Sequence, residues 1–199
     1  MLIISSLIFV KMVDFEYNIY MGIIGRNFYN RNTLEVAKDL LGCKLCRFTE
    51  NGIQEGVIVE TEAYTHDDPA CHAYSGKTPR SITLFKKSGL AYVYFIYGMY
   101  HCFNVTTEPE GIAGAVLIRA LEPLNIKDTN GPAKLCRAMN ITKELNEVDL
   151  TCKKSGLWIE EFKHFDNSEI ITTTRIGIKQ AADYPWRFYV KGNKFISKP

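Results

Sequence analysis

Two runs of strand-forming residues meet at an Asn-Gly pair, and this feature restricts the fold more than any other in the chain. The runs cover residues 43–49 and 53–62, with Asn51-Gly52 between them. Asn-Gly favours the positive φ angles of a tight hairpin turn, so the two runs are expected to pair antiparallel. Aromatic and β-branched residues predict further strands over residues 90–95, 100–107 and 115–120, and a terminal hairpin over 187–198 that turns at Gly192-Asn193.

Two short helices are expected beside these strands. Asn32 and Glu35 resemble a capping box, and apolar residues then recur at helical spacing, which predicts a helix over residues 33–41. A second helix begins at Gly131-Pro132, because proline fits the first helical position. Short strands joined by hairpins, with only a few flanking helices, predict a single α+β domain with a mainly antiparallel, curved β-sheet.

The chain's 199 residues suit one domain, which we place at residues 21–199. Residues 1–20 are expected to form an N-terminal extension outside the core. The first ten residues are almost wholly apolar, but this run is too short to span a bilayer. Lys11 follows the run, whereas a secretory signal carries its positive charge before it. We therefore expect no attachment to a membrane.

The six cysteines are expected to be free thiols, because nothing in the chain indicates secretion and its length does not require disulfides. Cys43 and Cys46 form a Cys-x-x-Cys pair without the second pair that a structural zinc site needs. No metal site is expected. The net charge of +2 is too small to indicate a class of partner.

Two glutamates and a tyrosine should share one face of the strand that ends near residue 62. Side chains alternate along a strand, so Glu60, Glu62 and Tyr64 point the same way if the strand continues that far. Carboxylates in an apolar strand have two explanations, which periodicity does not separate. They face solvent from a strand at the edge of the sheet, or they form a functional site.

The segment from Pro69 to Thr107 contains no Asp or Glu. It combines basic residues with aromatic rings, as nucleic-acid surfaces do, because cations neutralise phosphates and rings stack on unpaired bases. Rings that fill a core are the alternative, but a core does not explain the missing acids. The basic residues are His72, Lys77, Arg80, Lys86, Lys87 and His101, and the rings are Tyr74, Phe85, Tyr92, Tyr94, Phe95, Tyr97, Tyr100 and Phe103.

A carboxylate beside a basic, aromatic segment suits an enzyme that extrudes a base from DNA and attacks its sugar with water. The chain lacks the His-x-Glu and Pro-Cys-x-x-Cys motifs of the zinc deaminases and the Gly-x-Ser-x-Gly of serine hydrolases. A non-catalytic module that binds damaged or single-stranded nucleic acid remains the alternative.

The chain resembles the alkyladenine DNA glycosylase family, also called the 3-methyladenine DNA glycosylase family of the mammalian type. The resemblance runs from about residue 25 to about residue 192. The motifs that carry it are Val59-Glu-Thr-Glu-Ala-Tyr64, Thr78-Pro-Arg80, Tyr92-Val-Tyr-Phe-Ile-Tyr-Gly-Met-Tyr100, Cys102-Phe-Asn104, Arg119-Ala-Leu-Glu-Pro-Leu124, Gly131-Pro-Ala-Lys-Leu135 and Arg187-Phe-Tyr-Val190.

This resemblance separates the two glutamates. It implies that Glu62 is the general base that activates water, that Arg119 holds Glu62 and the water, and that replacing Glu60 has little effect. It further implies that Tyr64 and His72 enclose the flipped base, with Tyr94 on its opposite face.

The same resemblance implies that Asn104 excludes the amino group of normal guanine and that Tyr97 is the wedge that intercalates into DNA. Thr78, Arg80, Lys86 and Lys87 are expected to contact the DNA backbone. The implied protein is a monofunctional glycosylase that removes alkylated purines from double-stranded DNA, without a metal or organic cofactor. It is expected to act as a monomer in the cytoplasm.

Overall fold

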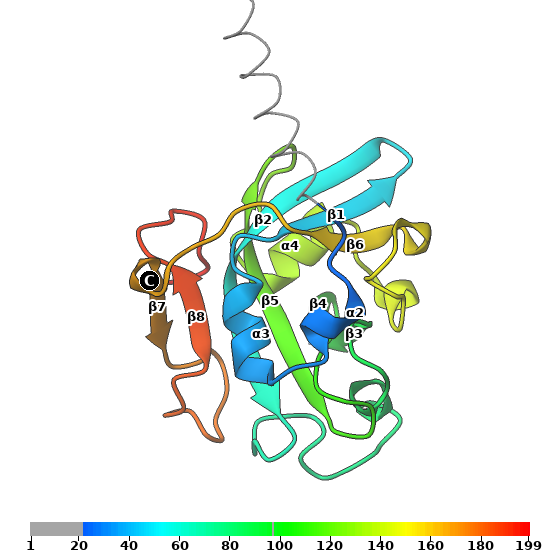
Figure 1. Cartoon of the computed structure of the whole chain (residues 1–199), viewed down its shortest axis with the longest axis vertical. Helices are drawn as coiled ribbons and strands as arrows, with labels where there is room; N and C mark the ends of the chain where they lie inside the picture. The colour runs from blue at the N-terminus through cyan, green and yellow to red at the C-terminus, as the bar shows by residue number, and fades with distance from the viewer. Residues whose placement is uncertain (1–21, 97) are drawn as a thin grey trace, which may run out of the picture.

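The computed structural model describes residues 22–96 and 98–199 and forms one α+β unit (Figure 1). The predicted extension over residues 1–20 lies outside the described residues, as does Tyr97. All the strand pairings within the described sheet are antiparallel, which confirms the predicted fold class. The strands are β1 Lys44–Thr49, β2 Gly52–Thr65, β3 Ala91–Ile96, β4 Tyr100–Thr106, β5 Gly114–Pro123, β6 Leu157–Glu160, β7 Ile170–Thr173 and β8 Arg187–Val190.

Strand β2 lies at the centre of this sheet. Strand β5 pairs along one of its edges, while β1 and then β8 pair along the other. The sheet order is β3-β4-β5-β2-β1-β6, and β7 joins it through β8. Glu60 and Glu62 lie in the part of β2 between β5 and β8, and both are fully buried. The explanation that they face solvent from an edge strand is therefore wrong.

The hairpin predicted at Asn51-Gly52 is confirmed, with Thr49 paired to Gly52 across the turn. The strands predicted over residues 90–95, 100–107 and 115–120 correspond to β3, β4 and β5. The predicted terminal hairpin is wrong, because β8 pairs with β2 on one edge and with β7 on the other. Both edges of β8 are thus occupied, and residues 191–199 form no strand.

Helices α3 (Thr33–Asp39) and α4 (Pro132–Ala138) cover one face of the sheet, over β2, β4 and β5 (Figure 1). Asn32 caps α3 by accepting from the Leu34 N–H, and the helix ends two residues before the predicted end. Gly42 then adopts a φ of 90°, which favours glycine. Helix α4 has its proline in the first turn, as predicted. The four-residue helix α2 (Arg26–Tyr29) is too short to produce an apolar period and was not predicted.

The main core lies between these helices and the sheet. Alternate residues of the same strands point to the opposite face, where a smaller cluster joins Tyr92 of β3 and Ala115 of β5 to residues of the loop after β2, including Cys71. That loop contains the short 3-10 helix η1 (Ile82–Phe85). The two faces therefore differ: one packs against helices, and the other is covered by a loop.

The segment between α4 and β8 showed little periodicity in the sequence and is mostly irregular. Besides β6 and β7 it contains the 3-10 helices η2 (Lys143–Leu145), η3 (Lys153–Ser155) and η4 (Asn167–Glu169). None of the described helices is long and apolar enough to cross a membrane.

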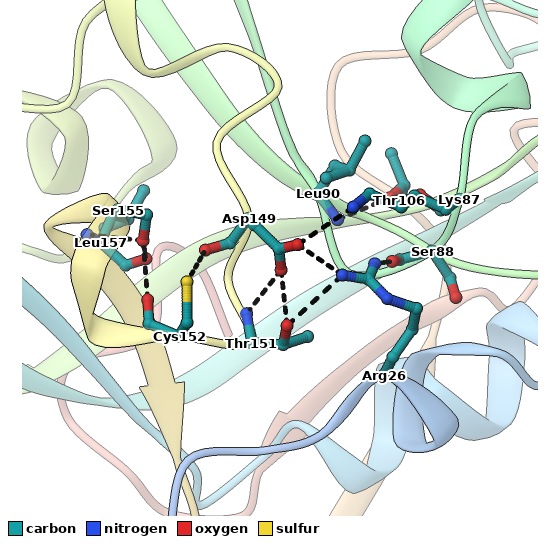
Figure 2. Close-up of polar contacts among 10 residues, drawn as sticks. All are labelled: Arg26, Lys87, Ser88, Leu90, Thr106, Asp149, Thr151, Cys152, Ser155 and Leu157. Atoms are coloured by element: carbon teal, nitrogen blue, oxygen red, sulfur yellow. Dashed lines mark hydrogen bonds and ion pairs between the residues drawn. The ribbon is translucent and has the colours of Figure 1, made fainter.

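Asp149 ties this irregular segment to the rest of the fold (Figure 2). Its carboxylate accepts hydrogen bonds from Arg26 of α2, from Lys87, and from the N–H and hydroxyl of Thr151. Burial alone would raise the pKa of Asp149, but the bonds from Thr151 and Lys87 and the charge of Arg26 outweigh it and lower the pKa to about 2. The charged form of Asp149 is therefore the form that stabilises the fold.

We predict that Asp149→Asn lowers the free energy of unfolding at pH 7 by about 1 kcal/mol, a value discounted because the carboxylate is partly exposed. The folded pKa lies below the unfolded value of about 3.9, so this stabilisation is complete above that value and is lost as the pH falls toward 2. Urea titrations of both proteins at several pH values measure the difference. A difference that stays constant from pH 5 to pH 2 would contradict the prediction.

Candidate active site

Glu62 is held from three directions on the loop-covered face of the sheet. Its Oε1 accepts from the N–H of Ile176 at 2.8 Å and lies 3.1 Å from Nη1 of Arg119 on β5. Its Oε2 accepts from the hydroxyl of Tyr64 at 2.8 Å. The predicted sharing of one face by Glu60, Glu62 and Tyr64 is confirmed, because all three meet on this side.

Glu60 is bonded more completely than Glu62. Its Oε1 accepts from Nε of Arg119 and from Nη1 of Arg187, both at 3.0 Å, and from the hydroxyl of Ser197 at 2.8 Å. Its Oε2 accepts from the N–H of Ser197 at 2.5 Å. Two buried carboxylates thus share two buried guanidiniums, which balances their charges.

Arg119 connects the two glutamates. Burial would lower the pKa of its guanidinium, but the neighbouring carboxylates of Glu62 and Glu60 outweigh that effect and raise it. Arg119 therefore stays charged and can stabilise the negative charge of Glu62 in a site from which solvent is largely excluded. The contacts of Glu60 change the expectation that its replacement has little effect, because Glu60 holds the arginine that Glu62 uses.

The predicted base-binding residues gather beside this charged pair. The rings of His72 and Tyr94 meet edge to face with centroids 4.6 Å apart, and His72 Nδ1 lies 2.9 Å from the hydroxyl of Tyr92. Tyr64 and Tyr94 are half-buried and pack against the same small cluster as Tyr92. The structure thus brings Tyr64, His72 and Tyr94 together.

Every ring in this group is uncharged at neutral pH. Burial, and then the charge of Arg80, lowers the pKa of His72 to about 4. Burial is also the largest cause that raises the pKa of Tyr64 and of Tyr94. Uncharged rings present electron-rich faces, which attract a cation placed above them.

Asn104 lies between the rings and the carboxylates. It is buried on β4 and donates from Nδ2 to the carbonyl of Tyr92 at 3.1 Å. Residues directly opposite one another in a sheet share a face, and here the cross-strand row runs from Tyr92 through Asn104 and Leu117 to Glu62. The sheet therefore places Asn104 in the same cross-strand row as Glu62, with Leu117 between them.

Two site residues were missed by the sequence reasoning. Arg175 and Asp68 form a fully buried ion pair through two N–H groups of the guanidinium, and Arg175 also donates to the carbonyl of Ala63. The guanidinium lies 4.6 Å from the ring centroid of Tyr64 and 5.1 Å from that of Trp186. No pattern in the sequence pointed to this pair, because its members are 107 positions apart.

Comparison with known proteins identifies the family to which the chain belongs. Residues 27–194 match the family model described as Methylpurine-DNA glycosylase. The chain is a member of the methylpurine-DNA glycosylase family. This membership confirms the resemblance inferred from the sequence and assigns the chain to a family of DNA repair enzymes.

Curated relatives of this glycosylase cover nearly all of it. A protein of Carboxydothermus hydrogenoformans is 48% identical over 190 residues, which is 88% of this chain and 99% of the relative. One of Clostridium botulinum is 48% identical with the same two shares, and one of Herpetosiphon aurantiacus is 42% identical over 88% of each chain. All three are named "Putative 3-methyladenine DNA glycosylase".

The four residues predicted to contact the DNA backbone have different surroundings in the glycosylase. Thr78 bonds to the hydroxyl of Ser81 at 2.9 Å. Lys86 pairs with Glu147 at 2.6 Å, and Lys87 pairs with Asp149 at 3.2 Å (Figure 2). Arg80 is exposed, has no ion pair among the described residues, and lies 5.2 Å from the ring centroid of Tyr94. Arg80 thus differs from Lys86 and Lys87 in having no carboxylate partner among the described residues.

The described residues contain no cluster of metal-binding side chains. Within residues 22–96 and 98–199, no three His, Cys, Asp or Glu side chains form a cluster that could hold a metal ion. All six cysteines are free, and five of them are buried. The positive charge beside Glu60 and Glu62 comes from Arg119 and Arg187.

We predict that Asp68→Asn destabilises the glycosylase by about 3 kcal/mol, because it leaves the Arg175 charge buried without its carboxylate. Urea unfolding monitored by circular dichroism gives the change. The matched control is Asp67→Asn, since Asp67 is exposed and the change should be about 0.5 kcal/mol or less. Equal losses from the two variants would show that the buried pair is not needed for stability.

Proposed function

We propose that this glycosylase hydrolyses the N-glycosidic bond of alkylated purines in double-stranded DNA, after flipping the damaged nucleotide out of the helix, with Glu62 activating the attacking water. The proposed substrates are 3-methyladenine and 7-methylguanine; hypoxanthine and ethenoadenine are neutral lesions whose release would also need protonation of the base. The observation that carries the proposal is a buried carboxylate that is ion-paired with Arg119 and accepts a hydrogen bond from Tyr64, beside a group of uncharged rings. The names of the relatives support the substrate class.

Hydrolysis of the N-glycosidic bond needs a general base that accepts a proton from water and a group that stabilises the positive charge on the sugar. A carboxylate that accepts a proton from water generates the nucleophile for C1′ of the flipped nucleotide. The same negative charge stabilises the positive sugar that develops as the bond to the purine breaks. Arg119 and the Ile176 N–H hold Glu62 in place during these changes. Water is the nucleophile, so the DNA strand stays intact.

The aromatic group supports a preference for cationic bases. Methylation at N3 or N7 makes a purine positively charged, and aromatic faces attract such a ring. Arg175 and Arg80 already lie over Tyr64 and Tyr94, so the base would meet the opposite face of each ring. His72 adds no competing positive charge, because its pKa of about 4 keeps it neutral. Asn104 is proposed to reject normal guanine by meeting its amino group, and Tyr97 to fill the gap left by the flipped nucleotide.

We predict that Glu62→Gln lowers the single-turnover rate of base release by about a thousandfold or more, because the amide cannot accept the proton of water. The assay measures 3-methyladenine released from methylated DNA and, separately, the integrity of the strand. A protein that binds such DNA without releasing a base would instead be a binding module. Trapping of a protein–DNA adduct by borohydride would refute water as the nucleophile.

We predict that Arg80→Ala weakens DNA binding and lowers the slope of log K against log salt by about one, the effect of one lost phosphate contact. Lys87→Ala is the matched control, because Asp149 already neutralises Lys87. Fluorescence anisotropy with a lesion-containing duplex at several salt concentrations measures both slopes. The proposal for Arg80 fails if the two variants have the same slope.

A further inference from the structure

Ser197 belongs to the segment after β8 and reaches the charged pair at the centre of the sheet. Its hydroxyl lies 2.8 Å from Oε1 of Glu60 and 3.2 Å from Nη2 of Arg119. Its N–H lies 2.5 Å from Oε2 of Glu60. Within the described contacts Ser197 meets neither Glu62 nor the rings. Any effect of Ser197 on the reaction must therefore pass through Arg119.

The guanidinium of Arg119 is divided among three partners. Nε bonds to Glu60 at 3.0 Å, Nη2 bonds to Ser197 at 3.2 Å, and Nη1 lies 3.1 Å from Oε1 of Glu62. An unrestrained guanidinium prefers to bind one carboxylate through two parallel N–H groups. Because Glu60 and Ser197 occupy two of its nitrogens, Arg119 offers Glu62 only one.

This division leaves the two oxygens of Glu62 unequal. Oε1 faces two donors, the Ile176 N–H and Arg119. Oε2 has one donor among the described residues, the hydroxyl of Tyr64. A carboxylate oxygen accepts about two hydrogen bonds, so Oε2 keeps one acceptor position. An attacking water needs such a position in order to give up its proton.

We propose that Ser197 and Glu60 are positioning residues that restrict Arg119 to one oxygen of Glu62 and so keep the other oxygen open for water. This inference rests on the proposed role of Glu62 as the base. Without the Ser197 hydroxyl, the planar guanidinium is held at Nε alone and can tilt as a whole, so that Nη1 and Nη2 face both oxygens of Glu62. Binding of DNA and of the base is unaffected, because Tyr64, His72 and Tyr94 keep their contacts.

The test compares three variants by single-turnover base release and by affinity for a lesion-containing duplex. Ser197→Ala should lower the rate about tenfold, the effect of a modest misplacement, while the dissociation constant stays unchanged. Ser197→Thr keeps a hydroxyl and should restore most of the rate. Glu60→Gln should lower the rate further, because it loosens Nε as well.

Ser155→Ala is the matched control for the loss of a serine hydroxyl. That hydroxyl bonds to the carbonyls of Cys152 and Leu157, away from the charged pair (Figure 2). The control should release bases at the rate of the unaltered protein, even if its melting temperature falls as much as that of Ser197→Ala.

Two results would overturn the inference. One is a Ser197→Ala protein that works at full rate, and the other is a loss that Ser197→Thr does not restore. Glu62→Gln separates this failure from failure of the proposed function. If Glu62→Gln is inactive while Ser197→Ala is fully active, only the positioning role is wrong. If Glu62→Gln is fully active, the proposed base itself is wrong.

Discussion

Two carboxylates are buried on the central strand of the sheet, and the segments around this strand supply the donors that stabilise them. A buried carboxylate loses its hydration, at a penalty of several kcal/mol, unless charged donors replace the water. Glu60 and Glu62 receive those donors from β5, from β8, from the loop before β8 and from the segment after it. Strand β2 must therefore be covered along both edges and over one face.

The proposed base-binding rings and the two carboxylates lie near one another on the same face of the sheet. Tyr92 lies at one end of a cross-strand row, Glu62 lies at the other, and Asn104 and Leu117 stand between them. In the proposed reaction, the rings attract a positively charged purine while Glu62 remains paired with Arg119. Strands set the positions of Glu62, Tyr94 and Asn104, whereas His72 and Ile176 lie on loops. The loops add the Ile176 N–H, which donates to Glu62, and the ring of His72, which meets Tyr94.

Local signals in the sequence predicted most of the elements. The Asn-Gly hairpin, the Asn32 cap and the proline that begins α4 each depend on neighbouring residues, and each is present. Alternation also predicted which side chains share the face of Glu62. Contacts between distant segments could not be predicted this way. Asp68 with Arg175, and the acids that neutralise the lysines of the acid-free segment, join parts of the chain that share no pattern.

The donors to the two glutamates come from far along the chain, and this affects how the protein folds. Ile176 lies 114 positions from Glu62, and Ser197 lies 137 positions from Glu60. Closing such long loops is entropically unfavourable, so these bonds form late. Burying either carboxylate before its arginine arrives would be unfavourable as well. Each carboxylate can therefore be buried with its charge balanced only after these distant segments have joined the sheet, so the hairpin of β1 and β2 cannot complete the charged pair by itself.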